Sequence, residues 1–130
     1  MSAVSQAHLT VEPRPTAQAE VRHWLRELGW FEGGVLEVLE LLLSELVANS
    51  VRHAGLAGSD KIEVAVQRWP LRVHAEVVDA GGNFRYSPAS DRARDRAGGW
   101  GFVLVEQLSD RWGWESNSAT KIWFELSTAA

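Results

Sequence analysis

The sequence predicts an α+β domain in two layers, with helices packed on an antiparallel sheet. Two helical patterns fall in the first half of the chain, and short alternating strand patterns dominate the second half. The break at residues 68–71 suits a hairpin between two of these strands. The chain has 130 residues, 45% of them hydrophobic, which is enough for one compact core. We therefore treat residues 1–130 as a single domain.

The first half of the chain predicts one strand and two helices. Residues 7–11 alternate weakly, which favours an edge strand within an N-terminal segment of about residues 1–12. Thr16 predicts the N-cap of a helix that ends at Gly29. A longer helix follows over residues 35–54. Its apolar side chains cover nearly the whole circumference, so we expect it to be buried on several sides.

The second half predicts four further strands, one long loop and a short helix. In chain order these are strands at 62–66 and 73–78, a loop over 79–101, a helix over 102–108, and strands at 111–115 and 121–126. A loop of this length inside a small domain is typically either functional or disordered.

Composition excludes several classes of function. The net charge is −4, whereas a sequence-independent grip on a nucleic-acid backbone needs a basic surface, so we expect no direct nucleic-acid partner. The absence of cysteine excludes thiol catalysis and thiolate metal sites. Glu37, Glu40 and Glu45 interrupt the most apolar stretch, and the N-terminus has no signal-peptide pattern. We therefore expect a soluble cytoplasmic protein without a membrane segment.

Glu45, Asn49 and His53 form a polar stripe on the otherwise apolar helix. Their spacing of four places them on one face. The Asn49 amide oxygen suits a hard cation such as Mg²⁺, and Glu45, one turn earlier, could accept a proton. Taken alone, the stripe fits a solvated helix face equally well.

Asp79 directly follows a predicted strand and begins a turn that contains Gly81 and Gly82. A carboxylate at a strand end can accept a hydrogen bond from an exocyclic amine such as that of adenine, and the glycines let the backbone come close to a flat ring. The same residues also fit an ordinary turn, because Asp-x-Gly is common in turns.

A glycine-rich stretch over residues 98–102 leads into the predicted short helix. Free backbone N–H groups at a helix N-terminus attract phosphate, and glycine permits a close approach. The stretch lacks the Gly-Lys-Ser/Thr of a P-loop and lies between no obvious parallel strands, so neither a P-loop nor a Rossmann site fits. Taken alone, it also fits a flexible hinge.

In this order, the three features resemble the ATPase domain shared by gyrase, histidine kinases and the MutL repair proteins, which has the Bergerat fold. Within that superfamily the chain resembles the anti-sigma factor serine kinases and their actinobacterial relatives. Residues 45–54, 98–113 and 120–126 carry the resemblance, which extends over about residues 16–127. It implies a two-layer sandwich of helices on a mostly antiparallel mixed sheet, with ATP and Mg²⁺ as cofactors.

The resemblance also implies roles for the stripe and for the adenine pocket. Asn49 would ligate Mg²⁺, and Glu45 would be the general base. His53 would lie near the phosphates or the lid. Asp79 would bind the adenine amino group, helped by Thr120.

The resemblance also implies roles for the glycines of the two glycine-containing segments. Gly81 would support the adenine pocket. Gly99 and Gly101, with the backbone of their neighbours Trp100 and Phe102, would line the triphosphate. Residues 84–97 would form a lid that carries four arginines, Arg85, Arg92, Arg94 and Arg96.

Three functions remain open at this point, and the third is an interaction module that binds no nucleotide. The first is a serine/threonine kinase that phosphorylates an anti-anti-sigma partner and sequesters a sigma factor, and so regulates transcription. The second is a non-catalytic ATP-binding module whose nucleotide-ordered lid binds a regulatory protein. A homodimer is also possible, because an exposed first strand could pair across a two-fold axis.

Overall fold

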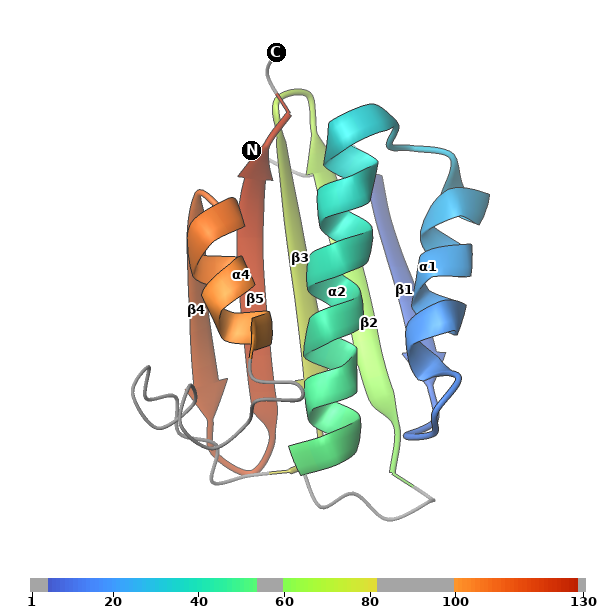
Figure 1. Cartoon of the computed structure of the whole chain (residues 1–130), viewed down its shortest axis with the longest axis vertical. Helices are drawn as coiled ribbons and strands as arrows, with labels where there is room; N and C mark the ends of the chain where they lie inside the picture. Colours follow the sequence, from blue (N-terminus) through green and yellow to red (C-terminus); the bar gives the residue numbers. More distant parts are fainter. Residues whose placement is uncertain (1–4, 54–59, 82–99, 129–130) are drawn as a thin grey trace.

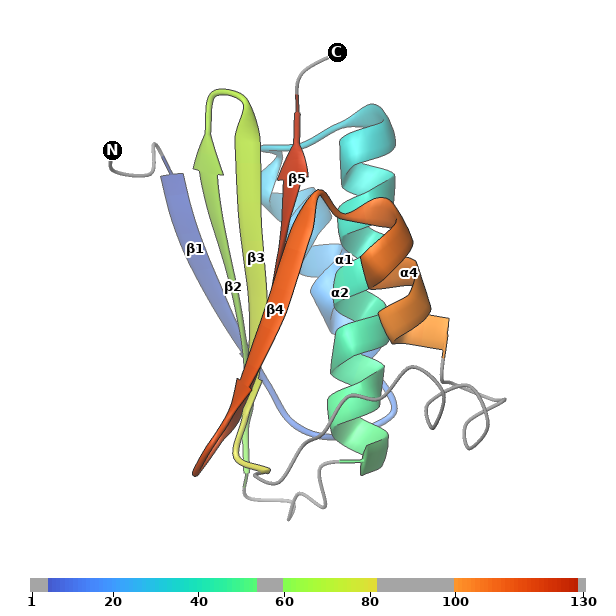
Figure 2. The same cartoon turned by 90° about the vertical axis from the view of Figure 1, so that its left-hand side faces the viewer.

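The computed structural model describes residues 5–53, 60–81 and 100–128, and it has two layers. Its elements are, in chain order, β1 (Ser5–Val11), α1 (Ala17–Leu28), α2 (Gly33–His53), β2 (Ile62–Trp69), β3 (Arg72–Asp79), α4 (Trp100–Leu108), β4 (Arg111–Ser116) and β5 (Thr120–Ser127). All three helices lie on one face of the sheet (Figure 1, Figure 2). The predicted α+β class is therefore confirmed.

The five strands form one sheet in the order β1-β2-β3-β5-β4. All four pairings of these described strands are antiparallel, so the mixed character that we expected has no counterpart in them. The order also differs from a simple meander, because β5 lies inside β4. Burial explains this: every second side chain of β5 is buried, whereas β4 carries none that is fully buried and suits the edge. The prediction of β1 as the other edge strand is confirmed.

Helix α1 shows one predicted terminus and one deviation. Gly29 ends the helix with a left-handed backbone (φ 67°), as the sequence indicates, and its N–H bonds to the carbonyl of Arg26. Thr16 occupies the N-cap position, but its side chain does not cap the backbone. Its hydroxyl instead donates to the Glu20 carboxylate over 2.8 Å. The prediction of Thr16 as the N-cap residue is therefore confirmed for its position, although its side chain makes no cap hydrogen bond.

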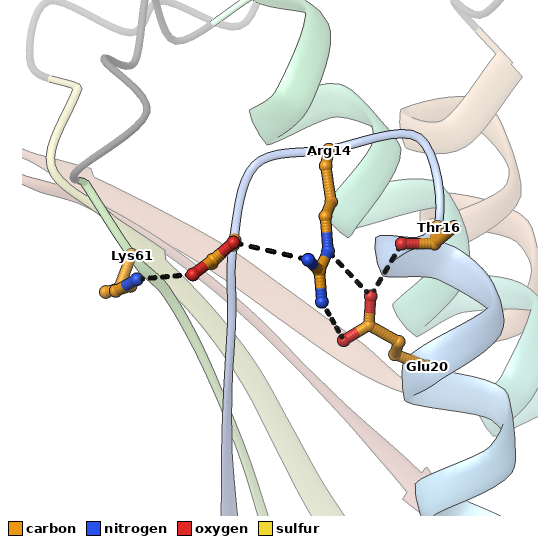
Figure 3. Close-up of polar contacts among 5 residues, drawn as sticks. Arg14, Thr16, Glu20 and Lys61 are labelled. Carbon is orange, nitrogen blue, oxygen red and sulfur yellow. Dashed lines mark hydrogen bonds and ion pairs between the residues drawn. The ribbon is translucent and has the colours of Figure 1, made fainter.

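The Thr16 hydroxyl bonds to the Glu20 carboxylate and not to the helix backbone because Glu20 is held in place by a wider polar network (Figure 3). Arg14 donates to Glu20 from Nε over 3.3 Å and pairs with Glu12 over 3.4 Å. Glu12 in turn accepts from Lys61 over 3.0 Å. The network joins the end of β1 and the start of α1 to the residue preceding β2. Because the groups are exposed to solvent, we expect each pair to contribute little to the free energy of unfolding.

Helix α2 is the central helix of the core. Its buried side chains include six at positions 42–44 and 46–48, so the expected burial on several sides is confirmed. The helix begins two residues earlier than predicted, at Gly33, and its predicted last residue, Ala54, lies outside the described residues. Within the part of the chain that the structure describes, no helix is both long and apolar enough to cross a membrane.

Candidate nucleotide site

Three chain segments that the sequence singled out meet at one end of the domain, and α4 directs its N-terminal end toward them. The last turns of α2, the end of β3 and the start of β5 lie at the lower end in Figure 1, and the first turn of α4 lies above them. The sheet register supports this arrangement, because Asp79 is paired directly with Thr120. Residues that are up to 71 positions apart in the sequence, from Asn49 to Thr120, are therefore gathered in one region.

Asp79 is the buried charged residue of this region, with a relative exposure of only 6%. One carboxylate oxygen accepts a hydrogen bond of 2.6 Å from the Ser50 hydroxyl of α2. The other accepts a bond of 2.9 Å from the backbone N–H of Gly81. A buried carboxylate needs such donors, and each of its oxygens keeps a further lone pair that can accept from a ligand.

Burial raises the pKa of Asp79 above its ordinary value. The hydrogen bonds from Ser50 and from the Gly81 N–H oppose this rise, because they favour the charged form. The negative charge of the Asp79 carboxylate is therefore stabilised by two neutral donors, the Ser50 hydroxyl and the Gly81 N–H. An amine of a bound ligand would act in the same direction as these donors, which makes the carboxylate a suitable acceptor for it.

Thr120 extends the hydrogen-bonded chain from β5. The residue is buried, and its hydroxyl donates to the carbonyl of Gly81 over 2.5 Å. A second contact of 3.0 Å joins it to the hydroxyl of Ser116 at the end of β4. Asp79, Gly81 and Thr120 are thus brought together, as the sequence led us to expect.

The polar stripe of α2 is only partly joined to this group. Asn49 is half-buried and directly precedes Ser50, the residue that bonds Asp79. Glu45 is also half-buried, one turn earlier, and lines a hollow between α1 and α2 together with Gln18 and Arg22. The backbone of His53 ends the helix, and its side chain lies outside the described part of the structure.

Helix α4 places the second glycine-rich segment at the same end. Trp100 and Gly101 form its first turn, so their backbone lies where the sequence predicts a phosphate-binding helix N-terminus. Gly99 and the proposed lid, residues 84–97, lie outside the described residues. The Phe102 ring is 3% exposed and packs in the core, 6.0 Å from the Trp112 ring. A nucleotide contact of Phe102 would therefore come from its backbone.

Two serines of the site were missed by the sequence analysis. Ser50 and Ser116 hold Asp79 and Thr120 in place, but serine is common in helices and turns and neither stood out. A signal for Ser50 existed. It lies three and four residues after Val47 and Leu46 on the buried side of α2, and a buried hydroxyl needs a partner.

With this geometry established, the chain can be compared with known proteins. A family model described as the histidine kinase-like ATPase domain matches residues 9–126. The match covers nearly the whole chain, and the chain belongs to this family. Comparison with curated proteins gives no significant match. Membership indicates an ATP-binding domain, and the buried Asp79 at the end of β3 fits an acceptor for the adenine amine.

Proposed function

We propose that the protein is a cytoplasmic Mg-ATP-binding regulator of transcription that acts as a serine/threonine kinase. It would transfer the γ-phosphoryl group of ATP to a serine of an anti-anti-sigma partner and sequester a sigma factor. The observation that carries the nucleotide-binding part is the buried Asp79 with its neutral donors Ser50 and Gly81. The kinase and its protein partners rest on the family and on the position of Glu45.

Separate residues of the site fit the adenine of ATP and the Mg²⁺ ion. Asp79 would accept the adenine amine, with Thr120 holding the adjacent Gly81 backbone. Asn49 would give its amide oxygen to Mg²⁺. No group of three His, Cys, Asp or Glu side chains among the described residues could hold a metal, so Asn49 and the phosphates of the nucleotide would share the ion.

Glu45 is the residue proposed to act on the partner. ATP supplies the phosphoryl group when bound, and the chain must orient the accepting serine and remove its proton. The carboxylate of Glu45 would accept that proton as the serine oxygen attacks. Its half-buried position beside the hollow between α1 and α2 leaves room for a segment of a partner protein.

The same position favours a second function. Glu45 lines the hollow together with Gln18 and Arg22 of α1. Among the described residues, no hydrogen bond joins Glu45 to the Asp79 group. A domain in which Glu45 stays outside the reacting region would bind ATP without catalysis and use the ordered lid to bind a regulatory protein. Pairing of two copies through the edge strand β1 is compatible with either function.

Replacement of Glu45 by glutamine separates these two functions. We expect Glu45→Gln to lower transfer of radiolabelled phosphate to a partner serine by about 100-fold or more, because the amide cannot accept the proton. ATP affinity, measured by calorimetry on the same protein, should stay unchanged. Glu37→Gln is the matched control, since Glu37 lies on the same helix and lines the same hollow.

Phosphate transfer to a panel of anti-anti-sigma-like proteins, measured for wild type and both variants, distinguishes the two functions. Transfer that requires Glu45 but not Glu37 supports the kinase. Equal transfer by wild type and Glu45→Gln contradicts the assignment of Glu45 as the base. ATP binding without transfer to any member of the panel favours the non-catalytic module.

A further inference from the structure

A cavity lies at the end of the domain opposite the candidate nucleotide site. It occupies about 380 Å³ between the α1–α2 connection and the β2–β3 hairpin, the upper end in Figure 1. This volume lies within the range of small-molecule sites, ~300–1,000 Å³. Its walls are mostly aromatic or apolar and include Trp30, Phe31, Val35, Trp69 and Pro70. The cavity shares no lining residue with the site around Asp79.

One cation, Arg68, faces this apolar cavity and is held in a fixed position. Its guanidinium lies over the Trp30 ring, 5.4 Å from the ring centroid. Nη1 donates to the Trp30 carbonyl over 3.2 Å, and Nη2 donates to the Ser5 hydroxyl over 3.3 Å. These partners use two of the five N–H donors of the group. The remaining donors are already oriented without further loss of side-chain freedom.

The charge of Arg68 has no counterion among the described residues. Its contacts with the described residues go to a carbonyl, a hydroxyl and an aromatic ring, and none goes to a carboxylate. Glu32 lines the same cavity but forms no ion pair with Arg68, and it is exposed at the rim. A half-buried guanidinium in an apolar cavity is a suitable partner for one carboxylate, which it can bind through two hydrogen bonds.

We propose that this cavity binds a small monocarboxylate with an aromatic or branched apolar body. Arg68 would bind the carboxylate, and Trp30, Phe31 and Trp69 would enclose the apolar part. The exposed charge of Glu32 at the rim disfavours ligands with several negative charges, such as nucleotides. The site is therefore distinct in chemistry, as well as in place, from the nucleotide site.

The seven tryptophans of the chain give a direct readout. We would titrate the ¹⁵N-labelled full chain, without nucleotide, with 3-phenylpropionate and with its neutral amide, and follow the indole N–H signals. We expect saturable shifts of the Trp30 and Trp69 signals with the carboxylate. The amide, which lacks the charge, should bind about tenfold more weakly or worse.

Variants test the role of Arg68. Arg68→Gln should weaken binding of 3-phenylpropionate by about tenfold or more. Arg72→Gln is the matched control, because Arg72 stacks on Trp69 at 4.4 Å but does not line the cavity, and it should bind like wild type. Val35→Trp should fill the cavity and abolish binding with Arg68 intact, which keeps the test valid if Arg68→Gln does not fold.

Three outcomes would overturn the proposal. They are the absence of a saturable shift at Trp30 and Trp69, equal affinity for the acid and the amide, and wild-type affinity in both Arg68→Gln and Val35→Trp. Because no nucleotide is present, none of these outcomes bears on ATP binding or on the kinase.

Discussion

At the scale of single residues, Asp79 makes the stability of the domain depend on pH through its buried carboxylate. Burial raises its pKa, so the folded chain retains this proton at pH values where the unfolded chain has lost it. The contribution of Asp79 to the free energy of unfolding is therefore greatest below the ordinary carboxyl value of 3.8. It decreases as the pH rises from that value through the raised pKa of the folded state.

Asp79→Asn tests this sign. The amide that replaces the carboxylate is neutral, so the variant should lack this decrease in stability with rising pH. The free energy of unfolding of the variant minus that of wild type should therefore increase with pH over that interval and then level off. Urea unfolding at a series of pH values measures the difference. A difference that instead falls as the pH rises toward 3.8 and stays level above it would show that the hydrogen bonds from Ser50 and Gly81 outweigh burial.

At the scale of elements, the packing of β4 against β5 depends on one glycine. A Cβ at Gly113 would lie 2.7 Å from the Cζ2 atom of the Trp123 ring, which covers it. Trp123 is also held by stacking on His74, with ring centroids 5.5 Å apart. The ring cannot move away without losing this contact.

We therefore expect Gly113→Ala to lower the free energy of unfolding by about 1–3 kcal/mol, as overpacking does. Gly34→Ala is the control, because a Cβ there meets no atom within 4 Å and its φ is not positive. It should leave stability unchanged or raise it by up to about 1 kcal/mol. Chemical unfolding of both variants is the measurement. Equal stability of Gly113→Ala and wild type would contradict the close packing.

The helices and strands also show which parts of the fold could be predicted from the sequence. The positions of the helices and strands follow from local periodicity, and Gly29 follows from backbone sterics, so both were predictable. The Thr16 side chain and the place of β5 inside β4 were not. The first depends on Arg14 and Glu20, and the second on which strand is buried by the helices, both of which are tertiary properties.

The same distinction applies to the candidate site. Asp79 could be named as a candidate from its place after a predicted strand and from the family resemblance, and Thr120 from the resemblance alone; their roles stay predictions. The Ser50 hydroxyl could not be assigned to Asp79, because their contact joins residues 29 positions apart. Whether Glu45 faces the reacting region or the α1–α2 hollow depends in the same way on how α1 packs, which no local pattern contains.

At the scale of the whole molecule, the sheet and α2 separate two chemically different ends. One end gathers Asn49, Asp79 and Thr120 from three elements, and the other holds the Arg68 cavity (Figure 1). The family match over residues 9–126 spans both ends and indicates ATP binding for the domain. We therefore propose that ATP binds at the first end, with Mg²⁺ on Asn49.

Calorimetry with ATP, in the presence and absence of Mg²⁺, tests this claim most directly. We expect the wild-type chain to bind ATP more tightly with Mg²⁺. Asn49→Ala should lose most of that enhancement, because the ion loses its amide ligand. Gln67→Ala removes an amide from the opposite face of the sheet and should behave like wild type. Absence of ATP binding by wild type, or an equal Mg²⁺ enhancement in wild type and Asn49→Ala, would contradict the account.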